Sequence, residues 1–271
     1  MRATSKASLD AVAARWEPVL VRVGKRAERF GGQLYELADL VADSPALARA
    51  LSDPARSAKD KAALAQQVVR GKVVREVSQL MAWLARSRWS EPEDVAHALE
   101  VLAVDSVLAA AQARGELDAV EDELFRFERL LAAERELRLS LGDKDVPLER
   151  RLALADEVLG GRAHPEVELF VKRAVRTARK RSLFSTLRSV GERAAERRSR
   201  LVATILAATP LTAAQTERLT AILERAYGRE VQVNVGVDAK LVGGLRITVG
   251  SHVIDGSVLG RLDEARSRLA S

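Results

Sequence analysis

The feature that most constrains the fold is an internal repeat with an offset of 90 residues. When residues 34–89 are compared without gaps to residues 124–179, fourteen of the 56 positions are identical, whereas composition alone gives about four or five. Leu51 recurs as Leu141, for example. Because the register holds across several helix ends and turns, the repeat predicts a duplicated helical bundle.

Apolar residues recur at helical spacing along both copies. In the first copy, Gly31-Gly32 is predicted to break the helical stretch 1–42. The later helices of this copy are expected over 44–51, 57–69 and 74–89, and from 93 past Leu102. In the second copy, helices are expected over 102–114, 118–133, 135–141, 148–159, 166–180 and 183–206. Short connections between amphipathic helices favour antiparallel neighbours around a common core.

Capping residues mark several of these helix starts. Ser44 precedes Pro45, and Ser57 is followed three residues later by Asp60, which predicts side-chain caps at both places. The patterns Ser90-Glu91-Pro92-Glu93 and Thr212 with Gln215 predict capping boxes.

The last part of the chain changes from a helical to a two-residue period. Valines at 231, 233, 235 and 237 alternate with Gln, Asn and Gly, which predicts a half-buried strand. Further short strands are expected at 245–249 and 253–254, and Ser257 is expected to cap a final helix. Gly243-Gly244 lies between two strands and lacks the P-loop pattern, so it predicts a bend rather than a phosphate site.

The composition is that of a helical, globular protein. The 271 residues are 47% hydrophobic, 30% charged and only 4% aromatic, and that length favours about two domains. The absence of cysteine excludes disulfides and thiolate metal sites. The longest uncharged run, 201–216, is interrupted by Pro210 and is too short to span a bilayer. The N-terminus has no apolar core typical of a signal peptide.

One basic region accounts for the net charge of +6, because residues 161–200 hold 12 Lys and Arg against 4 Asp and Glu. Clustered basic residues are the footprint of nucleic-acid binding, which is the alternative function for this chain. No aromatic residues are interleaved with the charges to stack on bases, so a solvated face is favoured and no nucleic-acid partner is expected. The patch consists of Lys172, Arg173, Arg176, Arg179, Lys180 and Arg181, with Arg197, Arg198 and Arg200 following on the next helix.

Residues with catalytic chemistry form no recognisable constellation. His97, His164 and His252 are far apart in sequence, and His164 before Pro165 is expected to act locally at a helix start. The acidic run 121–123 is expected on a solvated helix face. The sequence therefore predicts a protein that is not an enzyme, with no catalytic residues, no cofactor and no metal.

The C-terminal stretch resembles the signature of the delta subunit of F-type ATP synthases, the family of the oligomycin-sensitivity-conferring protein. The matching positions hold their spacing together over about the last 70 residues. The motif residues are Val237, Asp238, Leu241, Gly243, Gly244, Gly250, Asp255, Gly256 and Ser257. Residues 101–271 follow the plan of the family, and the first 100 resemble the extra helical domain of long actinobacterial delta subunits.

The resemblance implies a fold and an organisation. The expected fold class is mainly α, with two tandem bundles of six helices followed by a small α/β domain of a helix, a short three-stranded sheet and a helix. The expected domains are 1–100, the extra first copy; 101–207, the second copy and family bundle; and 208–271, the C-terminal domain.

The resemblance also implies a function. It is that of a non-catalytic stator component in the peripheral stalk of the proton-translocating synthase, where it links the alpha subunits of the catalytic head to the b subunits. The expected location is the cytoplasmic face of the cell membrane, with membrane contact only through the complex.

The resemblance does not distinguish which bundle binds the alpha subunits. The second bundle is favoured because it adjoins the C-terminal domain. Two apolar helix faces in this copy predict either core packing, the default, or a groove for an alpha helix. The hypothetical groove residues are Val107, Leu108, Ala111, Val167, Phe170, Val171 and Ala174.

Overall fold

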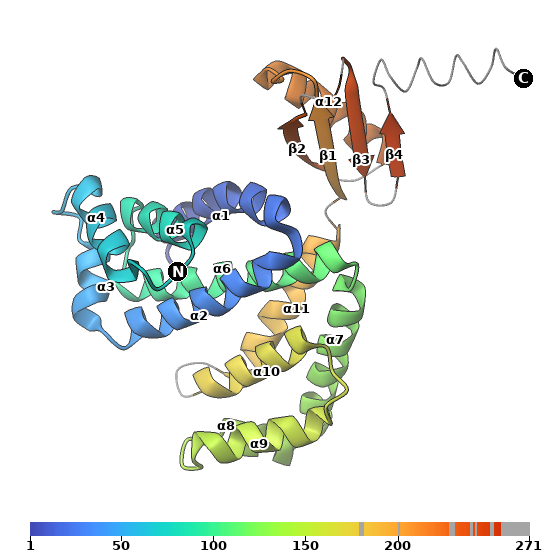
Figure 1. Ribbon diagram of the computed structural model, residues 1–271. Coiled ribbons are helices and arrows are strands. Elements are labelled where there is room, and N and C mark those ends of the chain that lie inside the picture. Colours follow the sequence, from blue (N-terminus) through green and yellow to red (C-terminus); the bar gives the residue numbers. More distant parts are fainter. Residues whose placement is uncertain are drawn as a thin grey trace, which may run out of the picture. The chain divides into compact units, whose positions relative to one another are not determined.

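The computed structural model describes residues 1–178, 182–199, 201–227, 231–238, 241, 243–249 and 252–255. The chain divides into two compact units, Met1–Ala195 and Glu196–Ser271 (Figure 1). Each unit has its own hydrophobic core. The mainly α fold class is confirmed, and the predicted division into three domains stays a prediction.

The first unit, which we call the helical unit, contains twelve helical elements within the described residues. The first six helices and the short 3-10 turn are α1 (Ala3–Val23), η1 (Gly24–Arg26), α2 (Ala27–Ala42), α3 (Pro45–Ser52), α4 (Ala58–Val69), α5 (Arg75–Arg86) and α6 (Glu93–Arg114). They are followed by α7 (Leu117–Ala133), α8 (Arg135–Gly142), α9 (Leu148–Leu159), α10 (Pro165–Thr177) and α11 (Leu183–Ser199), whose last residues belong to the second unit.

The duplication is confirmed by the helix starts. Helices α1 to α6 begin at residues 3, 27, 45, 58, 75 and 93, and α6 to α11 begin at 93, 117, 135, 148, 165 and 183, which is 90 residues later in every case. Helix α6 is therefore both the sixth helix of the first copy and the first helix of the second. The two copies share one helix rather than being joined by a linker.

Sharing α6 merges the two copies into one core. Thirteen residues of α6 are buried, on all sides of the helix. One continuous apolar cluster runs from Leu9 in α1 to Ala194 in α11. Burial of this apolar surface is the main force that stabilises the unit.

Two local predictions in the first copy are wrong. Helix α2 runs through Gly31-Gly32, and the chain instead breaks at Gly24, which has a φ of 57°. The predicted box at Ser90 is also absent: α6 has no side-chain cap, and the Glu91 amide donates to Asp94 at 3.2 Å.

The caps predicted at Ser44, Ser57 and Thr212 are confirmed. The side chain of Ser44 accepts from the Leu47 amide, and that of Ser57 accepts from the Asp60 amide at 3.1 Å. Thr212 and Gln215 form a reciprocal box, because each backbone amide donates to the side chain of the other.

The second unit contains a sheet with one helix packed against it. Its elements are β1 (Leu201–Ala207), α12 (Ala213–Tyr227), β2 (Val231–Val237), β3 (Leu245–Val249) and β4 (His252–Asp255). The sheet order is β2-β1-β3-β4, with β1 parallel to β2 and the other pairs antiparallel.

The three expected strands are present, and β1 joins them. The helix expected over 183–206 is wrong in its last turns, because α11 ends at Ser199 and β1 follows. The connection β1-α12-β2 is a parallel crossover, in which the helix covers one face of the two strands. Ala203 and Ile205 on β1 pack with Leu223 on α12 and Val231 on β2. The strand prediction missed β1 because the apolar residues of 201–207 also fit the continuation of a helix.

Candidate functional site

The two helical copies meet along α2, α6 and α10. Helices α2 and α6 make the most extensive helix–helix contact among the described residues. Gly31 makes this approach possible, because a Cβ atom there would clash with Cγ2 of Val107 and lie 3.1 Å from the carbonyl oxygen of Ala103. In a close-packed interior such an overlap forces the helices apart.

The seven residues of the hypothetical groove all lie in this core. Each is at most 1% exposed: Val107, Leu108, Ala111, Val167, Phe170, Val171 and Ala174. The face of α6 and α10 that was expected to receive a partner is covered within the chain, since α2 lies along α6 and reaches α10. Core packing therefore describes these residues, and a Phe170→Asp substitution would disrupt the core rather than test binding.

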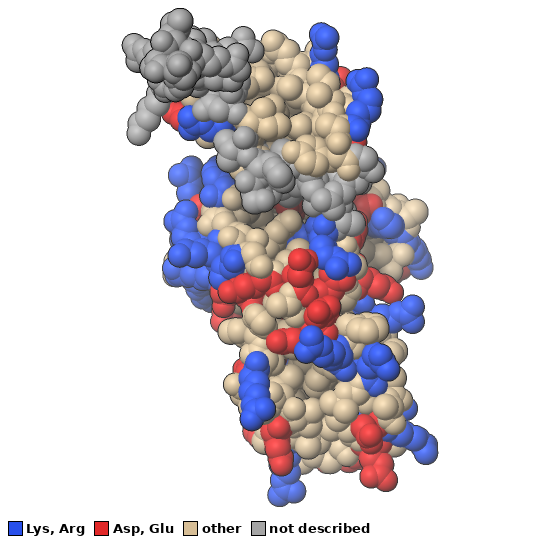
Figure 2. All heavy atoms as spheres, turned by 90° about the vertical axis from the view of Figure 1, so that its right-hand side faces the viewer, with Lys and Arg blue, Asp and Glu red and all other residues tan. Residues whose placement is uncertain are grey.

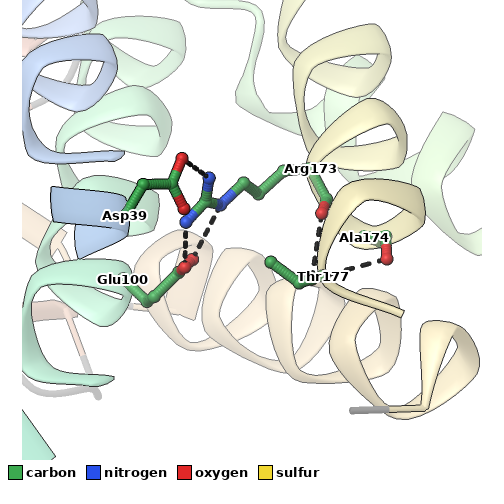
Figure 3. A network of polar contacts seen from close by, with 5 residues as sticks. All are labelled: Asp39, Glu100, Arg173, Ala174 and Thr177. Carbon is green, nitrogen blue, oxygen red and sulfur yellow. Dashed lines mark hydrogen bonds and ion pairs between the residues drawn. The ribbon is translucent and has the colours of Figure 1, made fainter. Parts of the chain in front are cut away.

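Arg173 of α10 ties the second copy to the first (Figure 3). Its guanidinium donates to Oδ2 of Asp39 on α2 at 2.7 Å and, through Nε, to Oε2 of Glu100 on α6 at 3.1 Å. A second contact, from Nη2, joins it to Oε1 of Glu100. The same guanidinium lies over the ring of Tyr35, 4.8 Å from its centroid, a favourable cation–π arrangement. One buried side chain thus contacts both copies and their shared helix.

The charge states within this network follow from its surroundings. Burial alone would lower the pKa of Arg173, but the hydrogen bonds that Arg173 donates to Glu100 and Asp39 outweigh this effect and the pKa is raised. Burial, together with the negative charge of Glu100, raises the pKa of the Tyr35 hydroxyl. Arg173 therefore stays charged and Tyr35 stays neutral at physiological pH.

Arg114, at the end of α6, makes a second set of links. Its guanidinium pairs with Glu28 of α2 at 3.2 Å and with Glu116 at 2.6 Å. It also pairs with Glu166 of α10, whose side chain is 1% exposed. Because removal of one partner leaves a buried charge uncompensated, Arg114 fixes α10 against α2 and α6.

Arg193 on α11 forms a bidentate pair with Asp105 on α6, at 2.8 and 2.5 Å. Planar, bidentate pairs of this kind set geometry as well as charge. The shared helix is therefore held by an arginine on α10 and another on α11, in addition to its own Arg114.

The predicted basic patch does not form a continuous basic surface in the described residues. Lys172 pairs with Asp156 at 2.6 Å and with Glu168, and its pKa is raised by the hydrogen bond to Asp156. Arg173 is buried in the network above, whereas Arg176 is exposed. The remaining members of the patch, Arg179, Lys180 and Arg181, lie outside the described residues, as does Arg200. On the next helix, Arg197 is buried and Arg198 is exposed. These ion pairs disfavour the nucleic-acid alternative.

His164 contributes to the structure of the second copy. The Nδ1 atom of His164 lies 2.9 Å from Oε1 of Glu123 on α7, and the His164 amide donates to the same carboxylate at 2.8 Å. His164 makes no side-chain cap at α10, so its predicted role as a cap is wrong. No group of three or more metal-binding side chains occurs among the described residues. Among those residues, too, no helix has the length and apolar character needed to cross a membrane.

Comparison with known proteins covers the whole chain. Residues 103–269 match the model of the family "ATP synthase delta (OSCP) subunit". The chain is 51% identical over 270 residues to ATP synthase subunit delta of Beutenbergia cavernae, with complete coverage of both chains. It is 43% identical to the same subunit of Kineococcus radiotolerans, over 98% of this chain and 96% of that one.

The chain belongs to the ATP synthase delta (OSCP) subunit family. As a delta subunit it is a non-catalytic component of the peripheral stalk of ATP synthase. A chain from the Toxoplasma gondii mitochondrial ATP synthase hexamer aligns with a TM-score of 0.29 at 16% identity, over 62% of this chain and 95% of that one. We draw no argument from this weak likeness.

The family model begins within α6, so α1 to α5 precede the matched region. The relatives extend across those helices at full length, so the first copy is shared with them. The delta family bundle in this chain is therefore built on the helix that it shares with the added copy.

The family motif lies on the second unit. Gly243-Gly244 forms a bend before β3, with a φ of 83° at Gly244, as expected of a residue without a Cβ atom. Leu241 is buried, whereas Val237 is 55% exposed. The Asp238 amide donates to the Ala207 carbonyl at 3.0 Å, which continues the pairing of β2 with β1. Asp255 ends β4. Gly250, Gly256 and Ser257, and with them the predicted final helix, lie outside the described residues.

Sequence reasoning missed the residues that hold the two helical copies together. Glu100 and Asp105 sit on a helix that was assigned to the ends of two separate bundles, and Arg173 was assigned to a surface patch. The signal was present in the 90-residue offset, which also aligns α1 with α6. Few side chains match there, because α1 is exposed on one side and α6 is buried on all sides.

Proposed function

We propose that this delta subunit holds the catalytic head through its first helical copy and the b subunits through its second unit. The family membership supports the stalk role. The assignment of the first copy rests on the internal repeat, because α2 already covers the α6 part of the equivalent face in the second copy.

A comparison of equivalent positions on α6 and α1 carries this assignment. On α6 the positions are at most 8% exposed: Val104, Val107, Leu108 and Ala111. On α1, 90 residues earlier, they are exposed or half-buried: Ala14, Glu17, Pro18 and Val21. This face of α1 is thus the counterpart of the α6 face that α2 covers, and it is open to a helix. The neighbouring positions on α5, Val77, Leu80, Met81 and Leu84, are buried in the core.

Trp83 on α5 occupies the position that Arg173 occupies on α10. It is half-buried, and the guanidinium of Arg15 lies over its ring, 5.7 Å from the centroid. Tryptophan and arginine are the residue types enriched where interfaces derive most of their affinity. The occupant proposed for this face is the N-terminal helical segment of an alpha subunit, lying along α1 as α2 lies along α6.

The second unit offers apolar surface of its own. Val235 and Val237 on β2 and Ile254 on β4 are 38, 55 and 50% exposed. Exposed apolar strands beside an otherwise packed sheet are typical of a protein-binding surface. We assign this surface to the C-terminal ends of the b subunits, so the protein lies on the cytoplasmic face of the cell membrane through its complex.

The shared helix suits the mechanical role. A stalk subunit that resists rotor torque has to transmit load without bending between its attachment points. A helix common to both copies, fixed by arginine pairs to α2, α10 and α11, leaves no flexible linker between them. Attachment at separate sites also raises the effective concentration of each contact.

The test is a titration of the full-length chain with a peptide of the alpha N-terminus. Trp83 is the only half-buried tryptophan, since Trp16 and Trp89 are 1 and 8% exposed, so its fluorescence reports on this face. Val21→Asp is expected to weaken binding about tenfold, because it places a charge in the apolar contact. Leu40→Asp is the matched control, since Leu40 is 42% exposed on α2, away from this face. Equal affinity of the Val21 variant and the wild type would refute the assignment.

A further inference from the structure

The outer face of α7 is bare where the equivalent face of α2 is covered. Tyr35 on α2 is 6% exposed, whereas Phe125, its equivalent on α7, is 58% exposed. Tyr35 lies on the helix that packs along α6, and the guanidinium of Arg173 on α10 lies over its ring. The second copy is followed by β1 rather than by a third copy, so no described helix of the helical unit does for α7 what α10 does for α2.

Phe125 lies in a stripe of exposed residues at helical spacing. Asp118, Asp122, Phe125 and Arg129 are separated by four, three and four residues, and all four are exposed, so they share one face of α7. We call them the α7 stripe. Figure 2 looks onto the side of the helical unit that carries α7, and acidic side chains gather there beside uncharged surface.

The charged residues of the α7 stripe make no buried ion pair within the described chain. Asp118 and Arg129 form no ion pair or side-chain hydrogen bond in the part of the chain that the structure describes. Asp122 pairs only with Arg126 of the next turn, at 3.8 Å, and both side chains are more than 70% exposed. Such an exposed pair contributes little to stability.

The sign of the charge at one position differs between α2 and its counterpart α7. At the position of Asp39 on α2, which faces Arg173, the second copy has Arg129. A helix covering α7 therefore needs an acidic residue where α10 has its arginine. At the other end of the stripe, Asp118 and Asp122 call for basic residues.

We propose that the α7 stripe binds an amphipathic helix of another subunit of the complex, which contacts α7 as Arg173 of α10 contacts Asp39 and Tyr35 on α2. This helix places an apolar residue on Phe125, Asp or Glu against Arg129, and Lys or Arg against Asp118 and Asp122. The proposal rests on the membership of the chain in the ATP synthase complex, but not on which copy binds alpha.

The occupant is another chain because the described helices of this chain are already engaged. Those of the helical unit share one core. Outside that unit, α12 packs Leu219 and Leu223 against its own sheet. A partner helix with the stated charges is the occupant that satisfies the stripe.

The experiment uses the full-length chain in the assembled ATP synthase. A photoreactive benzoylphenylalanine replaces Phe125 in one preparation and Leu139 in a second. Leu139 is the matched control, because it is 57% exposed and lies on α8, outside the stripe. We expect position 125 to cross-link to a helical segment of one other subunit, with at least tenfold higher yield than position 139.

Two substitutions test the chemistry. Phe125→Ser and Arg129→Glu are each expected to accelerate dissociation of the cross-linked subunit about tenfold, while the thermal midpoint of the free chain stays unchanged because both residues are exposed. A basic residue introduced at the cross-linked position is expected to rescue Arg129→Glu.

Several results would overturn the proposal: cross-links to residues 201–255 of the same chain, to a second copy of this chain or to nothing, or dissociation rates equal to wild type. A parallel cross-link from position 21 to alpha reports on the proposed function separately. If position 21 does not cross-link to alpha while position 125 still cross-links to its partner, only the assignment of alpha to the first copy is refuted.

Discussion

Replacement of Gly31 by alanine tests the close contact between α2 and the shared helix. Both Gly31 and Gly32 are inside α2, where alanine is intrinsically favoured over glycine by about 1 kcal/mol. A Cβ at residue 31 overlaps Val107 and approaches the backbone of Ala103, whereas a Cβ at residue 32 has nothing within 4 Å. The adjacent glycine is therefore a control of the same chemistry in the same helix.

Both variants gain the same helix propensity. The difference between their free energies of unfolding therefore reports the steric overlap of the Cβ at residue 31 with Val107. Overpacking of a close-packed core costs about 1–3 kcal/mol. We place Gly31→Ala toward the upper end, because Val107 is fully buried and the second contact is to backbone, which cannot rotate away. Gly32→Ala is expected to be about 1 kcal/mol more stable than wild type, and Gly31→Ala about 1–2 kcal/mol less stable.

Tryptophan fluorescence is a suitable assay, because all three tryptophans lie in the helical unit. Denaturant unfolding of the full chain followed at this signal reports on that unit alone, and each kcal/mol corresponds to roughly 2–4 °C in a thermal scan. The double variant Gly31→Ala, Val107→Ala is expected to be more stable than the sum of its single changes by at least about 0.5 kcal/mol. If Gly31→Ala stabilises the protein as much as Gly32→Ala, the argument that the close packing of α2 on α6 requires glycine at residue 31 is refuted.

Two further predictions concern buried charges. Arg173→Met is expected to lower the stability of the helical unit by about 1–3 kcal/mol in denaturant unfolding, because Asp39 and Glu100 lose their partner but stay partly hydrated; an unchanged midpoint would show that the network is not stabilising. Burial lowers the pKa of Lys61, whose side chain also donates to the Ser87 carbonyl. Because the unfolded chain binds this proton more tightly than the folded one, stability should rise as pH increases toward the ordinary lysine pKa. Lys61→Met should therefore be more stable than wild type at neutral pH, and the gap should narrow in alkaline buffer; a gap independent of pH would contradict this.

The second copy shows how far periodicity alone can go. The predicted range 148–159 coincides with α9, and the expected range 135–141 differs from α8 by one residue. Helix α9 lies between Pro147 and Gly160, and α8 ends at Gly142 before Asp143, so local chemistry defines these ends. The predicted helix over 183–206 failed at Leu201, because 201–207 forms a strand only through pairing with residues 231–237 and 245–249, which are distant in sequence.

The candidate site was harder to predict than the fold. Gly31 fits a helix break on propensity, and only its contact with Val107 explains a glycine inside α2. Arg173 fits a solvated basic face on composition, and only the placement of Asp39, 134 residues earlier, makes it a buried link. Both errors came from long-range contacts that have no local signature.

The amino-acid order alone established the duplication, the change to strands from residue 231 and the delta family signature, because hydrophobic period, caps and motif spacing are properties of neighbouring residues. Tertiary structure alone decided that the copies share α6, that α2 covers the face of α6, and that the faces of α1 and α7 are left open. Those outcomes depend on which surfaces bury one another, and burial is a property of the packed chain rather than of any segment of it.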